Sequence, residues 1–360
     1  MEFTHLHVHT EYSLLDGSNK INEYVARVKE LGMDSAAITD HGVMFGCIDF
    51  YRAAKAAGIK PILGCEVYVA PGSRFDKEIG KEEDRYYHLV LLAENQEGYQ
   101  NLIKIVSAGF VDGFYYKPRV DLEILEKYHE GIIALSACLA GEVARNITKG
   151  FYEESKKAAL HYEEIFGKGN FFLELQDHGI PEQQRVNQQL VRMSRETGIE
   201  LVATNDIHYT YSTDAEAHDI LLCVQTGKRL ADEDRMRYEG GQYYVKSVEE
   251  MAALFPYAPQ ALENTHKIAK RCNVEIEFGV TKLPKFHVPE GYNAWEYLNK
   301  LCFDGLAARY SGDMEELEER LNYELNVIKN MGYVDYFLIV WDFIRYARDH
   351  DIIVGPGRGS

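Results

Sequence analysis

The sequence HLHVHTEYSLLDG, residues 5–17, places three histidines at alternate positions near the N-terminus. Alternate residues of a β-strand point to the same side, so His5, His7 and His9 are expected to share one face of a strand. Two imidazoles on one face can bind the same metal ion. The alternative is a polar strand with incidental histidines, and three alternating histidines argue against it. The pair His7 and His9 therefore predicts a metal site at the start of the fold.

Short apolar runs alternate with longer amphipathic segments after this stretch. Strands are expected at residues 3–9, 35–39, 61–69, 86–92, 131–135, 171–175 and 199–203. Helices are expected between most of them, at residues 20–31, 46–57, 95–108, 141–148, 151–166 and 182–197. Strands separated by helices at this spacing predict a parallel sheet. Seven such strands favour a closed or nearly closed α/β barrel rather than a small open sheet.

The C-terminal part of the sequence has a mainly helical pattern. Helices are expected at residues 247–254, 258–271, 294–310, 313–331 and 335–348. Residues 279–293 contain Pro284, Pro289 and Gly291 and are expected to form a linker. This gives a first domain over residues 1–278 and a second region over residues 294–360. The last residues, IIVGPGRGS, have the pattern of a strand and a Gly-rich loop, and are expected to belong to a longer polypeptide.

Composition limits the classes of function. The 360 residues include 39 Lys and Arg against 57 Asp and Glu, a net charge of −18, so the chain is not expected to wrap DNA over its whole surface. The six cysteines are scattered without a CxxC pair, which argues against a zinc ribbon. The N-terminus lacks the pattern of a signal peptide, and no apolar run suggests a membrane span. We expect a cytoplasmic protein with no membrane contact.

Polar side chains follow two further predicted strands. In AAITDHG, residues 36–42, Asp40 and His41 come directly after an apolar run. In LVATNDIHY, residues 201–209, Asp206 and His208 alternate in the same way as the first histidines. Functional groups of parallel barrels collect at the carboxyl ends of the strands. These residues are therefore predicted metal ligands, with a helix cap as the alternative role of Asp40.

Three more candidates lie within or beside apolar strands. Glu66 lies inside ILGCEVYVA, and burial of an unpaired carboxylate costs several kcal/mol, so a cation is expected beside it. His88, in RYYHLVLLA, stands at the head of a strand, where a core histidine is the alternative. Cys138, in GIIALSACLAG, follows a strand, and a lone cysteine is more often a small core residue.

The ligand set predicts the metals and their chemistry. Mixed nitrogen, oxygen and sulfur ligands suit zinc, manganese or iron, whereas magnesium prefers oxygen. More ligands are present than one ion can use, so two or three divalent metals are expected. Clustered metals lower the pKa of a bridging water and clamp phosphate oxygens, which is the chemistry of phosphoester hydrolysis.

The motifs, in this order, resemble the PHP (polymerase and histidinol phosphatase) family. HLHVHTEYSLLDG, ITDHG, GCEVYV, TNDIHY and the C-terminal YFLIVWDFIRYARDHDIIVGPGRGS are similar to the N-terminal regions of bacterial DNA polymerase III alpha subunits. This resemblance covers essentially the whole chain. It implies a distorted seven-stranded β/α PHP barrel, followed by a mainly helical segment that leads into a truncated polymerase palm. The catalytic aspartates of the palm would lie beyond Ser360, so this chain is not expected to polymerise DNA.

The resemblance also implies a three-metal site with nine ligands. One metal would be held by His7, His9, Glu66 and Asp206, which are also the implied catalytic residues. Glu66 would bridge to a second metal that His88 and Cys138 hold. The third metal would be held by Asp16, His41 and His208.

Further roles follow from the same resemblance. His5, Asp40 and Asn205 would orient the ligands without touching metal. Arg119, in the YYKPRVD loop, is a candidate contact for substrate phosphate. Arg358, with Gly357 and Gly359 in GPGRGS, would help to hold the phosphates of the incoming nucleotide in the polymerase palm. A solvated loop arginine is the alternative for Arg119.

The implied activity is a 3′–5′ proofreading exonuclease that acts on the 3′ end of a DNA primer. Its expected partners are the rest of the polymerase alpha subunit and other replisome subunits, such as a sliding clamp or an exonuclease subunit. Two alternatives are a non-catalytic, metal-bound scaffold that stabilises the polymerase and a stand-alone small-molecule phosphatase. An amidohydrolase barrel also starts with HxH, but it would need a bridging lysine, and no lysine is suitably placed.

Overall fold

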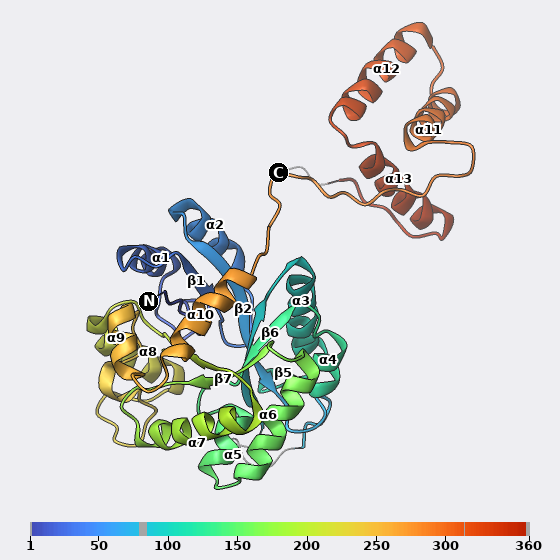
Figure 1. Ribbon diagram of the computed structural model, residues 1–360. Coiled ribbons are helices and arrows are strands. Elements are labelled where there is room, and N and C mark those ends of the chain that lie inside the picture. The colour runs from blue at the N-terminus through green and yellow to red at the C-terminus, as the bar shows by residue number, and fades with distance from the viewer. Residues whose placement is uncertain (1, 79–84, 313, 358–360) are drawn as a thin grey trace. The chain divides into compact units, whose positions relative to one another are not determined.

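The computed structural model describes residues 2–78, 85–312 and 314–357 (Figure 1). The chain divides into two compact units, Met1–Glu275 and Ile276–Ser360. The predicted end of the first domain, residue 278, lies close to this division. Each unit has its own core.

The first unit is built on one mixed, eight-stranded sheet. The strands run in the order β4-β5-β2-β3-β6-β7-β8, and β1 pairs with β2. Their bounds are β1 Ser35–Ile38, β2 Lys60–Val69, β3 Tyr87–Ala93, β4 Phe114–Tyr115, β5 Lys117–Val120, β6 Ile132–Leu135, β7 Phe171–Leu175 and β8 Leu201–Ala203. Six predicted strands are present, and the β4–β5 hairpin was not predicted.

Helices surround the curled sheet (Figure 1). Their bounds are α1 Ile21–Glu30, α2 Cys47–Ala57, α3 Gln96–Val111, α4 Leu122–Lys127, α5 Glu142–Thr148, α6 Tyr152–Phe166, α7 Pro181–Thr197, α8 Ala215–Thr226, α9 Val248–Leu254 and α10 Pro259–Arg271, with single 3-10 turns at Ser212–Asp214 and Glu239–Gly241. Strands followed by helices along most of the chain confirm the predicted α/β barrel. The short α4 and the helix α8 were not predicted.

The first predicted strand, residues 3–9, is an extended segment rather than a regular strand. The amide of Thr39 donates to the carbonyl of Val8 at 2.9 Å, and the amide of His9 donates to the carbonyl of Ile207 at 2.7 Å. The segment therefore lies between the end of β1 and the residues that follow β8. Because it contacts both, it closes the curled sheet and buries its histidines.

The prediction of a parallel sheet is wrong at β3, because this strand runs antiparallel to both of its neighbours. Tyr68 of β2 lies opposite His88, and Val90 lies opposite Leu135 of β6. A parallel pair needs a long crossover, usually a helix. The described residues between β2 and β3, 70–78 and 85–86, contain no helix. As a result, the start of β3 lies at the same edge of the sheet as the carboxyl ends of β2 and β6.

A buried apolar cluster fills the barrel and extends to α10. Leu6 of the first extended segment and Ile62, Ile133 and Val202 of the sheet pack with Ile268 from α10. The amide of Thr4 also donates to the Thr265 hydroxyl at 2.9 Å. Helix α10 thus packs against the barrel core and belongs to the first unit.

The second unit contains three helices, α11 Ala294–Arg309, α12 Met314–Asn330 and α13 Val334–Asp349. Leu298, Leu325 and Leu338, one from each helix, form its small core. Asn293 caps α11, because its side chain accepts from the amide of Glu296 and the Glu296 carboxylate accepts from the amide of Asn293. This cap ends the segment predicted as a linker. No helix within the described residues is long and apolar enough to cross a bilayer.

Candidate metal centre

Glu66, from the buried strand β2, is at the centre of a cluster of imidazoles. Its Oε1 lies 3.2 Å from Nε2 of His7 and 2.9 Å from Nδ1 of His88. Its Oε2 lies 2.5 Å from Nδ1 of His41. Glu66 has no solvent exposure. Burial raises the pKa of this carboxyl, but the charges of His88 and His41 outweigh burial and hold the pKa well below its usual range. The carboxylate is therefore ionised in the core.

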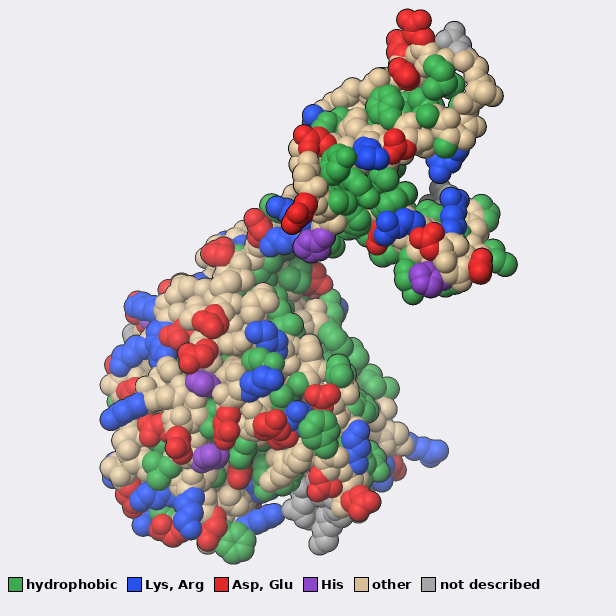
Figure 2. Space-filling view, turned by 90° about the vertical axis from the view of Figure 1, so that its right-hand side faces the viewer, with side chains coloured by type: hydrophobic (Ala, Val, Ile, Leu, Met, Phe, Trp, Pro, Cys, Tyr) green, Lys and Arg blue, Asp and Glu red, His purple; other side chains and the backbone are tan. Residues whose placement is uncertain are grey.

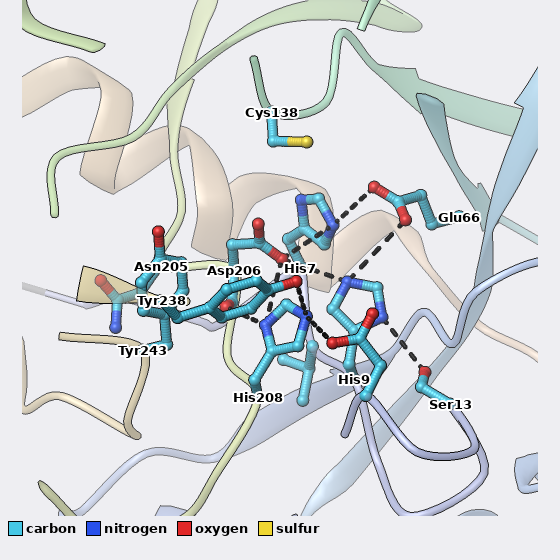
Figure 3. Close-up of polar contacts among 12 residues, drawn as sticks. His7, His9, Ser13, Glu66, Cys138, Asn205, Asp206, His208, Tyr238 and Tyr243 are labelled. Atoms are coloured by element: carbon cyan, nitrogen blue, oxygen red, sulfur yellow. Dashed lines mark hydrogen bonds and ion pairs between the residues drawn. The ribbon is translucent and has the colours of Figure 1, made fainter. Parts of the chain in front are cut away.

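Asp206 approaches the same cluster from the residues after β8. Its Oδ1 lies 3.3 Å from Nε2 of His7 and 3.1 Å from Nε2 of His9 (Figure 3). The backbone of Asp206 has a φ of 45°, in the left-handed region. Non-glycine residues adopt this region rarely, and such strain is concentrated at functional sites. The turn directs this carboxylate at the histidines of the first segment.

Asp16, His41 and His208 form another part of the cluster. Oδ2 of Asp16 lies 3.2 Å from Nε2 of His41, and its Oδ1 lies 3.9 Å from Nε2 of His208. Gly17 allows the turn that presents Asp16, because a Cβ at this position would lie 2.2 Å from the carbonyl oxygen of Thr10. The rings of His9 and His41 stack with centroids 3.8 Å apart.

Cys138 faces the cluster from the loop after β6 (Figure 3). Its Sγ lies 3.6 Å from Nδ1 of His88. Ala137, directly before it, has a φ of 63°. Burial, together with the charge of Glu66, raises the pKa of the Cys138 thiol well above its usual range. A thiol ligand must lose its proton to bind metal, so a cation would have to supply the compensating charge.

The buried polar atoms of this cluster fit divalent metals. Buried polar groups almost always have hydrogen-bond partners. Within the described part of the chain, six buried atoms that face the cluster have none: His7 Nε2, His9 Nε2, Asp16 Oδ1, His41 Nε2, Glu66 Oε1 and Asp206 Oδ1. Ligand atoms within 4.8 Å of one another occur in three groups: His7, His9 and Glu66; Glu66, His88 and Cys138; and His9, His41 and His208.

These groups compare closely with the implied metals. The group Glu66, His88 and Cys138 is the same as the implied ligand set of the second metal. The group His7, His9 and Glu66 contains three of the four implied ligands of the first metal. The third group contains His41 and His208, two of the three implied ligands of the third metal, and has His9 in place of Asp16. The three groups contain seven of the nine implied ligands, and the other two, Asp206 and Asp16, contact His7 and His41 of these groups. In this cluster a glutamate, Glu66, stands where an amidohydrolase barrel would have a lysine.

Glu174, in β7, is a site residue that sequence reasoning missed. Its Oε1 accepts a hydrogen bond from Nδ1 of His7 at 2.7 Å, and from the hydroxyl of Thr204 at 2.5 Å. Gln176 donates to the same oxygen at 3.0 Å. This contact fixes the ring of His7 with Nε2 toward the cluster, as carboxylates do for metal-binding histidines. A carboxylate inside the apolar run FFLEL gives the same sequence pattern that identified Glu66.

Asp40 supports the cluster through a second residue. Its Oδ1 accepts from the amide of Thr10 at 2.6 Å and from the hydroxyl of Ser13 at 2.6 Å. The Ser13 oxygen lies 3.2 Å from Nδ1 of His9 (Figure 3). Asp40 therefore orients His9 through Ser13.

Asn205 holds the segment 238–246 beside the cluster. Its side-chain amide donates to the carbonyls of Gln242 at 2.9 Å and Tyr244 at 2.7 Å. From this segment Tyr238 reaches the cluster, with its hydroxyl 3.3 Å from Nε2 of His208 (Figure 3). Tyr238 was not predicted, because a tyrosine in a polar segment carries no distinctive pattern.

Two predicted roles are corrected by the structure. Nε2 of His5 lies 2.9 Å from the carbonyl of Lys246, so His5 supports a neighbouring segment and does not orient a ligand. The guanidinium of Arg119 is fully buried, and it donates to backbone carbonyls, including that of Asp76 at 2.6 Å. Arg119 therefore stabilises its loop and does not contact phosphate. Arg358, the other predicted phosphate contact, lies outside the described residues.

Acid is expected to destabilise the fold through His178. Its Nε2 donates to the carbonyl of Asn205 at 2.9 Å, and Nδ1 accepts from Gln183 at 2.8 Å. Burial lowers its pKa from 6.5 to about 4. Between these two pH values the unfolded chain takes up a proton and the folded chain does not, so the free energy of unfolding falls as pH falls. In the variant His178→Gln, the free energy of unfolding should change less between pH 7 and pH 5 than in the wild-type chain, as measured by urea unfolding. His161→Gln, at an exposed histidine, should keep the wild-type slope, and equal slopes in all three proteins would contradict the assignment.

Two family models match separate parts of the chain. Residues 5–178 match the family model of the PHP domain. This part of the chain is a PHP domain. Residues 296–360 match the family described as bacterial DNA polymerase III alpha NTPase domain.

Relatives match the chain along its whole length. The DNA polymerase III subunit alpha of Treponema pallidum is 47% identical over 361 residues, covering 100% of this chain and 31% of the relative. That of Borreliella burgdorferi is 48% identical over 360 residues, covering 99% and 31%. The chain thus spans about a third of the length of these relatives, and corresponds to the N-terminal region of polymerase III alpha subunits. Among solved structures, an amidohydrolase from Chromobacterium violaceum aligns with a TM-score of 0.40 and 15% identity over 58% of this chain and 88% of that one.

Proposed function

We propose that the PHP domain of this chain is a metal-dependent 3′–5′ exonuclease that hydrolyses phosphodiester bonds at the 3′ end of DNA. The observation that carries this proposal is the cluster of six buried nitrogen and oxygen atoms, Glu66 Oε1 among them, that lack a hydrogen-bond partner. Two of the same residues, Asp16 and His41, also line a cavity that opens at the surface. A substrate could therefore reach the cluster.

The residues have separate tasks in this proposal. Two or three divalent metals, zinc, manganese or iron, would be held by the nine converging ligands: His7, His9, Asp16, His41, Glu66, His88, Cys138, Asp206 and His208. Bound there, such metals would supply an activated water and neutralise phosphate oxygens. Glu174 and Asp40 keep the imidazoles of His7 and His9 in position, so the ligands need little reorganisation on binding.

The relatives suggest where this activity is used. We propose that the chain is the PHP region of a replicative polymerase, with the PHP domain at residues 1–278, a linker at 279–293 and the start of the palm at 294–360. The activity would then serve proofreading of the primer 3′ end in the cytoplasm. The rest of the alpha subunit is the proposed partner, together with a sliding clamp or a separate exonuclease subunit.

A primer-degradation assay tests the proposal. The purified chain, supplied with manganese or zinc, should shorten a primer that ends in a 3′ mismatch. A double variant, His9→Ala with Asp206→Asn, should lose this activity because it removes two ligands of one implied metal. Equal degradation by the chain and the double variant would rule out the exonuclease. Metal binding without turnover would instead favour the scaffold role.

A further inference from the structure

A cavity with aromatic walls adjoins the proposed metal centre. It has a volume of about 220 Å³, and its lining includes the ligands Asp16 and His41. Phe110, Phe114 and Tyr116 line the same cavity, and we call these three side chains the aromatic wall. The two parts are continuous, so a molecule bound in the cavity would have one end at the metal centre and the other at the aromatic wall.

The aromatic wall is exposed although it is apolar. Phe110 lies in the last turn of α3, Phe114 belongs to β4, and Tyr116 lies in the turn between β4 and β5. Their exposed fractions are 41%, 50% and 62%. The rings of Phe110 and Phe114 have centroids 6.2 Å apart and are tilted by 31°. A cluster of exposed apolar side chains commonly marks a binding site.

The backbone also indicates function at the aromatic wall. Tyr116 has a φ of 62°, and Leu15, beside the ligand Asp16, has a φ of 61°. Both are exposed apolar residues in a conformation that costs free energy for a residue with a side chain. Strain of this kind persists where the surrounding structure enforces it, and it is concentrated at ligand sites.

The charge of the chain favours a ligand that is bound by its rings. A net charge of −18 repels phosphates, and acidic and basic side chains are interspersed over the face shown in Figure 2. Phosphate contacts alone would therefore give weak binding to DNA. Aromatic side chains bind single-stranded nucleic acid by stacking on bases, whatever their sequence. Lys117, which also lines the cavity, offers one cation for the backbone.

We propose that the aromatic wall stacks an unpaired nucleobase at the 3′ end of single-stranded DNA, with the adjoining phosphate at the metal centre. This inference rests on the proposed exonuclease and assigns its substrate class. A cavity of about 220 Å³ is smaller than the roughly 300–1,000 Å³ typical of sites for drug-sized ligands, so it suits one base rather than a base pair. A frayed or mismatched end can supply such a base, because it is already unpaired.

Binding of two oligonucleotides to wild-type and variant chains tests the inference independently of hydrolysis. Both are oligothymidylates of ten nucleotides with a phosphorothioate as the last linkage. The 3′-terminal nucleotide is 2-aminopurine in one and abasic in the other. The proteins are the 360-residue chain and the double variant Phe110→Leu with Phe114→Leu, which keeps apolar side chains but removes the two phenyl rings of the aromatic wall. Phe151→Leu is the matched control, since Phe151 is a similarly exposed ring that does not line the cavity. All titrations contain manganese.

We expect the preference for the base-containing end to depend on the phenyl rings of the aromatic wall, and we call this dependence the coupling. The wild-type chain and Phe151→Leu should quench 2-aminopurine and bind the base-containing end about tenfold more tightly than the abasic end. The double variant should show little quenching and bind both ends equally. The inference is overturned if the double variant keeps the wild-type quenching and tenfold preference, or if the wild-type chain shows no preference, as expected of a wall that docks protein. If the wild-type chain does not hydrolyse an ordinary phosphodiester linkage but shows the coupling, the proposed exonuclease is refuted and the stacking site is still supported.

Discussion

Glu66→Gln is expected to abolish phosphodiester hydrolysis and to remove most of the bound metal. Glu66 belongs to two of the three groups of converging ligand atoms, and its two oxygens contact three imidazoles. Glutamine keeps the size of the side chain but removes its charge, and its NH₂ group would face imidazole nitrogens. Loss of metal should lower kcat/KM by at least about a thousandfold, equivalent to about 4 kcal/mol of transition-state stabilisation.

The same substitution at two other glutamates shows whether the effect is specific to Glu66. Glu174→Gln should lower metal affinity or activity about 10- to 100-fold, because Glu174 positions His7 without being an implied ligand. Glu142→Gln is the matched control, since Glu142 is partly buried and accepts a hydrogen bond from Tyr162 at 2.8 Å. It should retain metal and activity. Metal content by mass spectrometry, together with initial rates, would order the three variants, and equal losses in all three would contradict the central role of Glu66.

Removal of divalent metal is expected to lower the melting temperature of the first unit by about 10 °C. A ligand at a thousand times its Kd stabilises the folded state by about 4 kcal/mol. For a domain of this size each kcal/mol corresponds to roughly 2–4 °C. The nine ligands come from segments between residues 7 and 208, so metal joins distant parts of the chain. Calorimetry before and after chelation measures the shift.

The ligand variants supply the control for this second prediction. The double variant His9→Ala with Asp206→Asn lacks two ligands, so chelation should change its melting temperature much less. Restoring manganese or zinc to the chelated wild-type chain should restore its transition. A chelated chain that melts at the temperature of the metal-loaded chain would show that the cluster does not need metal for stability.

Most of the first unit could be predicted from the sequence because its strands and helices have strong local patterns. Six strands and most helices lie within a few residues of their predicted bounds. The direction of β3 was predicted wrongly, because the apolar run around Leu89 and Val90 is compatible with either direction. The lack of a helical pattern before His88 was the one indication of an antiparallel pair.

The candidate site was predictable where residues alternate or where a charge interrupts an apolar strand. His7, His9, Asp206 and Glu66 have such patterns. Glu174 has the second pattern and could have been found. His88 was uncertain only because β3 was assumed to be parallel, and its true direction places His88 at the edge with the other ligands.

The remaining roles depend on tertiary contacts that local sequence does not specify. Whether an arginine in a loop faces phosphate or backbone carbonyls depends on the path of the surrounding chain, and Arg119 faces carbonyls. The aromatic wall depends on the short β4–β5 hairpin, which brings Phe114 and Tyr116 beside Phe110 and was not predicted.

Anomalous diffraction from crystals of the metal-loaded chain tests the central claim most directly. Data collected on both sides of the manganese or zinc absorption edge locate each ion independently of the refined structure. We predict two or three anomalous peaks within bonding distance of the converging ligands, with Glu66 touching two of them. A crystal grown with excess metal that shows no peak beside Glu66, His7 and Asp206 would contradict the metal centre and the hydrolytic function built on it.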